Sequence, residues 1–227
     1  MADGFFVLTL LLMGLEWFVV ATRRTRWRII TKPAPMVFLI LWFTIVGKWQ
    51  GGLVWFGMAL VFSLMGDIFL LFPFRFFLPG LIAFSLAHIF YITGFNMSAV
   101  EVKAGAWLIT LIIILVAVFD FAPIVRKVNI QPSRYKLLPP VMFYAIIISL
   151  MLLSAWLVLA RTGWNGSAVI LVILGASLFF LSDSLLAREK FIRPAKFGGL
   201  AVMVTYLLAQ LLITTGALIH FSGRLRV

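Results

Sequence analysis

Eight long apolar segments follow one another along the chain, and only short polar loops separate them. They cover approximately residues 4–22, 33–49, 52–72, 76–97, 104–125, 139–160, 166–187 and 198–220. Each is about 17–24 residues long, the length that an α-helix needs to cross roughly 30 Å of hydrocarbon. Charged residues make up only 11% of the 227-residue chain, which is too few to cover a soluble domain. The sequence therefore predicts an all-α bundle of eight transmembrane helices in a single membrane domain, residues 1–227.

Basic residues are distributed unevenly between the two sets of loops. If the N-terminus lies outside, the inner loops hold 14 of the 19 basic residues. The positive-inside rule then predicts that both termini lie outside. Short loops with this charge asymmetry suit a bacterial inner membrane. The formal net charge of +12 is explained by topology and by contact with anionic membrane lipids, so no nucleic-acid partner is expected.

Two aspartates lie at matching depth inside apolar segments. Asp67 ends the run Ser-Leu-Met-Gly-Asp, Asp183 ends the run Phe-Leu-Ser-Asp, and each lies near the inner end of its segment. A carboxylate at membrane depth is costly and is by default a candidate functional group. We therefore expect Asp67 and Asp183 to face each other across one polar site that opens towards the cytoplasm or the inner leaflet.

A weak internal repeat supports this expectation. Residues 86–94 match residues 208–216, and upstream of these stretches Asp67 corresponds to Asp183. The pattern is typical of two four-helix halves in the same orientation, with possible half-repeats at 1–103 and 104–227. An axis along the membrane normal would then bring the two aspartates together.

Other polar residues are expected to turn towards the same site, because unpaired polar groups are costly in lipid. Several lie three or four residues apart and therefore share one face of a helix. The residues predicted to bind substrate or support the site are Lys32, Ser63, His88, Tyr91, Tyr144, Ser182, Tyr206 and Gln210. For each of them, helix packing alone is the alternative that the sequence leaves open.

Two further acids lie near the inner ends of their segments. Glu16 is expected to pair with Arg23 or Lys32, and Asp120 with Arg126 or Lys127. These pairings predict structural ion pairs at the edge of the site.

Several chemistries have no support in the sequence. The chain has no cysteine, so it offers no thiol nucleophile and no thiolate metal site. Its two histidines, His88 and His220, lie at opposite depths and cannot form a three-histidine zinc site. There is no Gly-Xaa-Ser-Xaa-Gly nucleophile motif. We expect neither a metal nor a cofactor.

Four motifs in order resemble the lysoplasmalogenase (YhhN-like) family of integral membrane hydrolases. They are Lys32-Pro33, the stretch 63–67, His88-Ile89-Phe90-Tyr91 and the stretch 175–183. The resemblance covers essentially the whole chain. It implies an enzyme that cleaves the vinyl ether bond of lysoplasmalogens to a fatty aldehyde and a glycerophospho-headgroup, with a lysophospholipid as the substrate. It also implies that Asp67 and Asp183 are the family's paired catalytic aspartates.

The chemistry of vinyl ethers suits two carboxyl groups. Vinyl ethers hydrolyse through protonation of the β-carbon, which gives an oxocarbenium ion that water traps. One carboxylic acid would supply the proton and one carboxylate would stabilise positive charge or activate water, as two carboxyl groups do in glycosidases. The sequence does not indicate which aspartate is the acid.

Two alternatives from other classes stay open at this point. One is a small-molecule or lipid transporter with a proton-coupling carboxylate pair, because such proteins also have repeats and intramembrane acids. The other is a structural or lipid-scaffolding protein, in which both aspartates would tolerate substitution. The oligomeric state cannot be inferred from the sequence.

Overall fold

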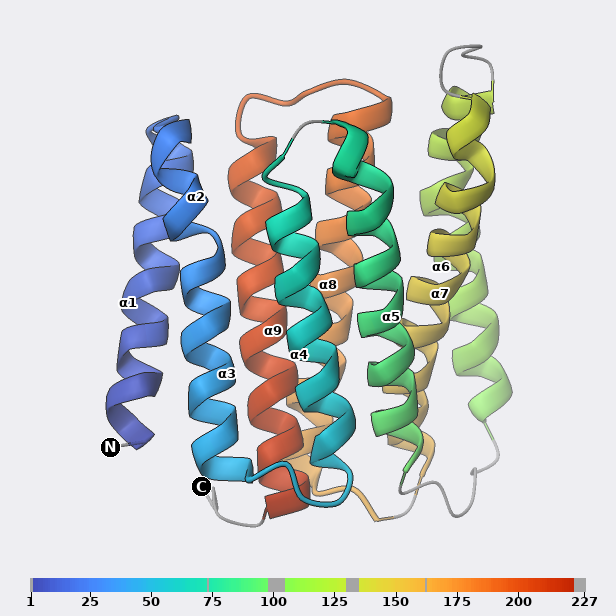
Figure 1. The fold of residues 1–227 in the computed structure, drawn as a ribbon. Coiled ribbons are helices and arrows are strands. Elements are labelled where there is room, and N and C mark those ends of the chain that lie inside the picture. The colour runs from blue at the N-terminus through green and yellow to red at the C-terminus, as the bar shows by residue number, and fades with distance from the viewer. Residues whose placement is uncertain (1, 73, 98–104, 130–134, 162, 223–227) are drawn as a thin grey trace.

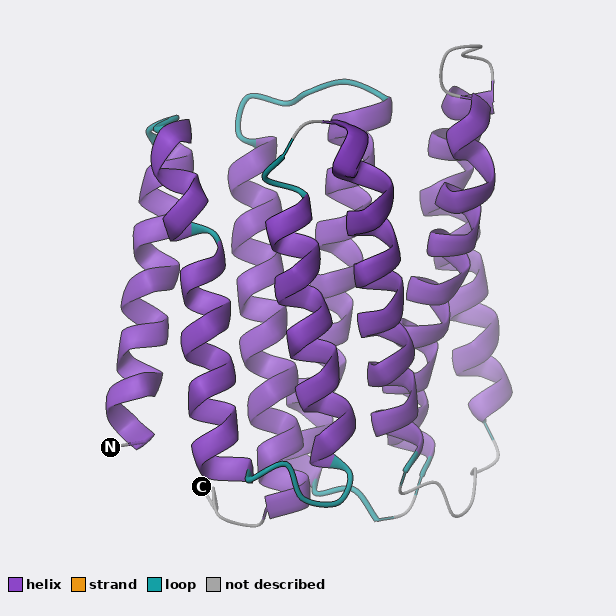
Figure 2. Ribbon diagram, in the orientation of Figure 1, coloured by secondary structure: helices purple, strands orange, loops and turns teal. Residues whose placement is uncertain are grey.

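The structure is a computed structural model that describes residues 2–72, 74–97, 105–129, 135–161 and 163–222. The described part is helical and contains no β-strand (Figure 2). The α-helices are α1 (Ala2–Ala21), α2 (Arg28–Thr31), α3 (Pro33–Gly47), α4 (Leu53–Phe69), α5 (Phe77–Asn96), α6 (Ala106–Asn129), α7 (Leu138–Trp156), α8 (Gly166–Phe191) and α9 (Gly198–Ser222). The predicted all-α fold class is confirmed.

The long helices run alternately in opposite directions, so the bundle has two faces (Figure 1). The loops after α4 and α8 lie on one face, which also carries α2. The start of α1 and the end of α9 lie towards the other face. Among the described residues, seven of the eight long helical segments have the length and hydropathy of a membrane span, and α4 is an apolar helix of 17 residues. The chain is therefore a multi-pass membrane protein.

Local sequence explains where the helices begin and end. Pro33 stands at the start of α3, where its missing N–H removes no helical hydrogen bond. Lys48 adopts a left-handed conformation with φ of 53° and ends the same helix. At the start of α8, the Asn165 side chain accepts a hydrogen bond from the backbone N–H of Ser167.

Two boundaries differ from the prediction in a way that affects the site. The second span begins with the short helix α2, which continues through Lys32 into α3. Helix α8 extends to Phe191, four residues beyond the predicted end at 187. Its last turns therefore carry Arg188 and Lys190 on ordered helix. The predicted boundary between half-repeats, at residues 103 and 104, lies outside the described residues.

The centre of the bundle consists of two helical hairpins. Helices α8 and α9 pack most extensively, followed by α4 and α5. A Cβ atom on Gly175 of α8 would lie 3.0 Å from the Ala209 carbonyl oxygen of α9, so these backbones are in close contact. By contrast, α6 lies at the edge against α7 and α8, and only 17% of its span is buried, against 67% for α9. The two predicted acids lie on α4 and α8 in the central hairpins.

Candidate active site

A polar cavity of about 230 Å³ lies near the face that carries α2 and the α8–α9 loop. Both Asp67 and Asp183 line it, although they come from different hairpins. The other polar residues in its wall are Arg28, Lys32, Ser182, Glu189, Lys190 and Tyr206. The structure therefore brings the two aspartates to one cavity, as the sequence predicts.

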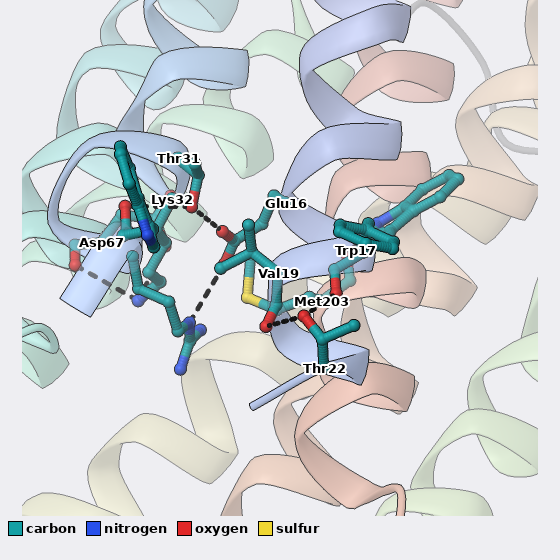
Figure 3. Close-up of polar contacts among 11 residues, drawn as sticks. Glu16, Trp17, Val19, Thr22, Thr31, Lys32, Asp67 and Met203 are labelled. Atoms are coloured by element: carbon teal, nitrogen blue, oxygen red, sulfur yellow. Dashed lines mark hydrogen bonds and ion pairs between the residues drawn. The ribbon is translucent and has the colours of Figure 1, made fainter. Parts of the chain in front are cut away.

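Asp67 is held by a cation and a hydroxyl. Its side chain is 2% exposed, and its Oδ1 lies 3.3 Å from the Nζ of Lys32. The Tyr206 hydroxyl donates a hydrogen bond of 2.6 Å to Oδ2. Lys32 also donates to the Asp67 carbonyl oxygen at 3.2 Å (Figure 3). The first two contacts are of the kind that stabilise an ionised carboxylate, whereas the third is made to the backbone.

Asp183 has different partners. The Tyr144 hydroxyl donates a hydrogen bond to its Oδ2, and the Nε2 of His88 lies 3.3 Å from the same oxygen. The same His88 nitrogen lies 3.0 Å from the Tyr144 hydroxyl, so the three groups form one cluster. No lysine or arginine forms an ion pair with Asp183 among the described residues.

A second, apolar pocket begins at Asp183. Its volume is about 40 Å³, and Tyr144, Asp183 and Lys190 are the polar residues in a wall that is otherwise apolar, with side chains such as Phe84, Phe121 and Leu186. The residues that line both the pocket and the polar cavity are Leu70, Phe84, Asp183, Leu186 and Lys190. Asp183 therefore lies between a polar and an apolar space, whereas Asp67 lines only the polar one.

The two hairpins hold each other's acids. Asp67 of α4 is bonded by Tyr206 of α9, and Asp183 of α8 contacts His88 of α5. In both cases the partner comes from the second helix of the other hairpin. The site is thus complete only when the two hairpins are packed together.

The predicted pairing of Glu16 is wrong. Its Oε2 accepts a 2.5 Å hydrogen bond from Thr31, and its Oε1 lies 3.2 Å from the Nε of Arg28, so neither Arg23 nor Lys32 is the partner (Figure 3). Helix α2 folds back beside α1 and brings the side chains of residues 28 and 31 to Glu16. The contact fixes Arg28 at the cavity wall.

The predicted pairing of Asp120 is also wrong. Its partners are Arg188, at 2.9 Å, and the Ser184 hydroxyl, at 2.5 Å, both on α8. On a helix, Lys127 lies about 10 Å further along the axis than Asp120, and Arg126 points to another side. Asp120 therefore joins α6 to α8 instead of the end of its own helix.

Five of the eight predicted supporting residues lie at the polar cavity or contact Asp183 in its wall. Lys32, Ser182 and Tyr206 line the polar cavity, and His88 and Tyr144 reach it through Asp183.

The remaining three, Ser63, Tyr91 and Gln210, are buried but line neither the cavity nor the apolar pocket. The Tyr91 hydroxyl donates a 2.5 Å hydrogen bond to the Oε1 of Gln210, which joins α5 to α9. Their part in supporting the site stays a prediction.

Sequence reasoning missed three charged residues in the cavity wall: Arg28, Glu189 and Lys190. A usable signal existed for one of them. Asp183, Leu186 and Lys190 are spaced at i, i+3 and i+7, which is one face of a helix if that helix continues past 187.

The fold and the site define the class of this protein. It is a multi-pass helical membrane protein in which two buried carboxyl groups with different partners line one cavity. Comparison with known protein families identifies the family to which the chain belongs. A family model described as the YhhN family matches residues 27–217, and the chain belongs to this family.

Curated relatives carry a more specific name. Human lysoplasmalogenase TMEM86B is 36% identical over 160 residues, which cover 70% of this chain and 62% of the human protein. The rat protein of the same name is 33% identical over 189 residues, covering 82% of this chain and 70% of the relative. Human lysoplasmalogenase TMEM86A is 27% identical over 171 residues, covering 70% of this chain and 63% of the relative. No solved structure matches the chain.

Proposed function

We propose that this protein is a membrane-embedded hydrolase that cleaves the vinyl ether bond of a lysoplasmalogen or a related single-chain ether lipid. The products are a fatty aldehyde and a glycerophospho-headgroup. The names of the curated relatives support the substrate class. The observation that carries the mechanism is that two carboxyl groups line one cavity and have unlike partners.

The unlike partners assign the roles of the two acids. Asp67 faces the ammonium group of Lys32 and acts as the ionised carboxylate. Asp183 faces the apolar pocket, has no lysine or arginine as an ion-pair partner among the described residues, and acts as the proton donor. His88 and Tyr144 hold its carboxyl group in place.

The reaction then proceeds in three steps: protonation, addition of water and cleavage of the hemiacetal. Asp183 transfers its proton to the β-carbon of the vinyl ether, and the double-bond electrons form the new C–H bond. The resulting oxocarbenium ion is stabilised by the negative charge of Asp67. Water adds to the cationic carbon and loses a proton to a carboxylate. The hemiacetal then breaks its C–O bond, which releases the aldehyde and the glycerol hydroxyl.

Charged groups at the cavity wall are suited to the headgroup. Arg28, Lys32 and Lys190 present cationic groups that would hold a phosphate, and Glu189 on the same wall would attract the ammonium of ethanolamine or choline. In our proposal this face is the cytoplasmic face of a bacterial inner membrane, and both termini lie outside. The loop charges support this orientation.

The decisive experiment measures aldehyde release by the purified protein in detergent micelles. Wild type should release free aldehyde from a lysoplasmalogen, and Asp67→Asn and Asp183→Asn should each abolish the release. Asp3→Asn makes the same chemical change at an exposed position of α1 and serves as the matched control. Full activity in either cavity variant, with the fold intact by circular dichroism, would contradict the assignment.

The transporter alternative is not favoured, because the curated relatives are named as hydrolases of this substrate class. The same detergent assay separates the two functions, since micelles have no sealed compartment across which to transport. Uptake into proteoliposomes without any product would reverse our conclusion.

A further inference from the structure

An apolar groove of about 410 Å³ lies between α6 and α7. Its lining on α6 extends from Ile113 to Val125, a length of about 18 Å at 1.5 Å per residue. Small side chains leave the space between the helices, notably Ala117 and Ala145. The only hydroxyl in its lining belongs to Ser149, which donates to its own helix backbone at 2.6 Å, so the surface is effectively hydrocarbon.

Phe121 connects this groove to the candidate active site. Its ring lines the groove and also the apolar pocket that contains Asp183 and Tyr144. Phe121 is 7% exposed and packs edge-on against Phe180, with ring centroids 5.5 Å apart. Phe121 is therefore the residue that the inner pocket and the groove have in common.

The helix that carries Phe121 is weakly held. Only 17% of the α6 span is buried inside the protein. The neighbouring residue Asp120 joins α6 to α8 through Arg188 and Ser184, and its partner Arg188 is 42% exposed at the side chain. A partly exposed ion pair contributes little stability, so a small displacement of α6 next to Phe121 has a low cost.

The volumes limit where a long chain can lie. The inner pocket, at about 40 Å³, has room for roughly three water-sized groups. The vinyl ether carbons are the first carbons of the chain beside the headgroup. They fit at Asp183, but the rest of a long chain does not, and the groove beyond Phe121 is the adjoining apolar space.

We propose that the hydrocarbon chain of the substrate passes Phe121 and lies in the α6–α7 groove during the reaction, and that Phe121 is the residue that determines access and chain length. This inference rests on the proposed hydrolase function. The headgroup lies at the cationic wall, the reacting carbons at Asp183, and the chain leaves sideways towards the membrane interior. Phe121 positions the chain and takes no part in the chemistry.

The test compares two substrates with the same headgroup. One has a short alkenyl chain that ends within the inner pocket, and the other has a long chain that reaches the groove. Ala117→Phe fills the groove, so it should lower kcat/KM for the long-chain substrate by about tenfold or more and leave the short-chain value within about twofold. Leu115→Phe adds an equal ring at an exposed position of α6 that lines no cavity described here, and it should change neither value.

Equal effects of Ala117→Phe on both substrates, or no effect on either, would overturn the proposal. If Ala117→Phe lowers the melting temperature in detergent, Phe121→Ala replaces it. This variant widens the passage and should raise the long-chain to short-chain ratio of kcat/KM. An unchanged ratio in Phe121→Ala would equally overturn the proposal.

A binding experiment separates this inference from the proposed function. The probe is a non-hydrolysable alkyl ether lysophospholipid with a photoreactive diazirine at the chain end. Labelling of peptides from α6 and α7 should fall with excess unlabelled analogue and in Ala117→Phe, but not in Leu115→Phe. If wild type binds in this way but releases no aldehyde, the hydrolase function fails and the groove assignment survives. Labelling that excess analogue does not reduce would reject the groove.

Discussion

Tyr206 and Tyr91 offer a matched pair for testing which hydroxyls serve the site. Tyr206 donates to Asp67, and Tyr91 donates to Gln210 away from the cavity. A hydrogen bond to a charged group contributes about 1.5–3 kcal/mol, so Tyr206→Phe should lower kcat by roughly 10- to 100-fold. Tyr91→Phe should leave kcat within about twofold and lower the melting temperature. Aldehyde release and thermal unfolding in detergent measure both effects, and a large kcat loss in Tyr91→Phe would contradict this division.

The buried ion pair between Lys32 and Asp67 should couple strongly. Lys32→Met leaves a buried carboxylate without its cation and is expected to destabilise the protein by about 3–5 kcal/mol. Adding Asp67→Asn removes the unpaired charge, so the double variant should recover much of the stability while remaining inactive. Thermal or denaturant unfolding of the two single variants and the double variant tests this double-mutant cycle. Additive losses would show that the two side chains do not interact.

For individual residues, the sequence identified the charged groups of the site better than the neutral polar groups. Asp67, Asp183 and Lys32 could be singled out because an ionisable group in hydrocarbon needs a partner. Ser63 and Gln210 share helix faces with Asp67 and Tyr206, but one helical turn moves a side chain by about 5.4 Å along the axis. That distance puts both outside the cavity wall, and periodicity carries no information about it.

Among the elements, α8 and α9 depend on the close approach at Gly175. A Cβ atom there would lie 2.7 Å from Ile213 Cγ1 and 3.0 Å from the Ala209 carbonyl oxygen, so the helices would have to move apart. Gly175→Ala should destabilise by about 1–3 kcal/mol through overpacking, despite the better helix propensity of alanine. Gly14→Ala on α1 meets nothing within 4 Å and should not destabilise. Melting temperatures of both variants decide this, and equal values would contradict it.

The helices themselves could be predicted because each long apolar run has to satisfy its own backbone hydrogen bonds in lipid. The residues at which the helices end were harder to predict. Residues 188–190 are charged, so hydropathy places the end of the seventh span at 187, yet α8 continues to Phe191. Lys190 is compatible with this extension because its ammonium group lies over the Phe77 ring, with Nζ 5.0 Å from the centroid. Contacts of this kind between distant segments are not encoded in local pattern.

For the whole molecule, topology can be tested without background because the chain has no cysteine. Gln50→Cys lies in the loop between α3 and α4, and Arg193→Cys lies in the loop between α8 and α9 on the opposite face (Figure 1). A membrane-impermeant thiol reagent should label Gln50→Cys in intact cells and Arg193→Cys only after permeabilisation, because in the proposed orientation the basic loops lie inside. The reverse labelling pattern would invert the orientation.

The way in which each hairpin holds the other's acid also bears on how such a protein arises. If the two halves descend from a duplication, a four-helix ancestor had to meet a second copy in the bilayer before any complete site existed. The activity of this ancestor would then have depended on its concentration in the membrane and would have been lost on dilution. Joining the copies in one gene replaces that bimolecular encounter with a permanent tether, so activity per molecule becomes independent of expression level.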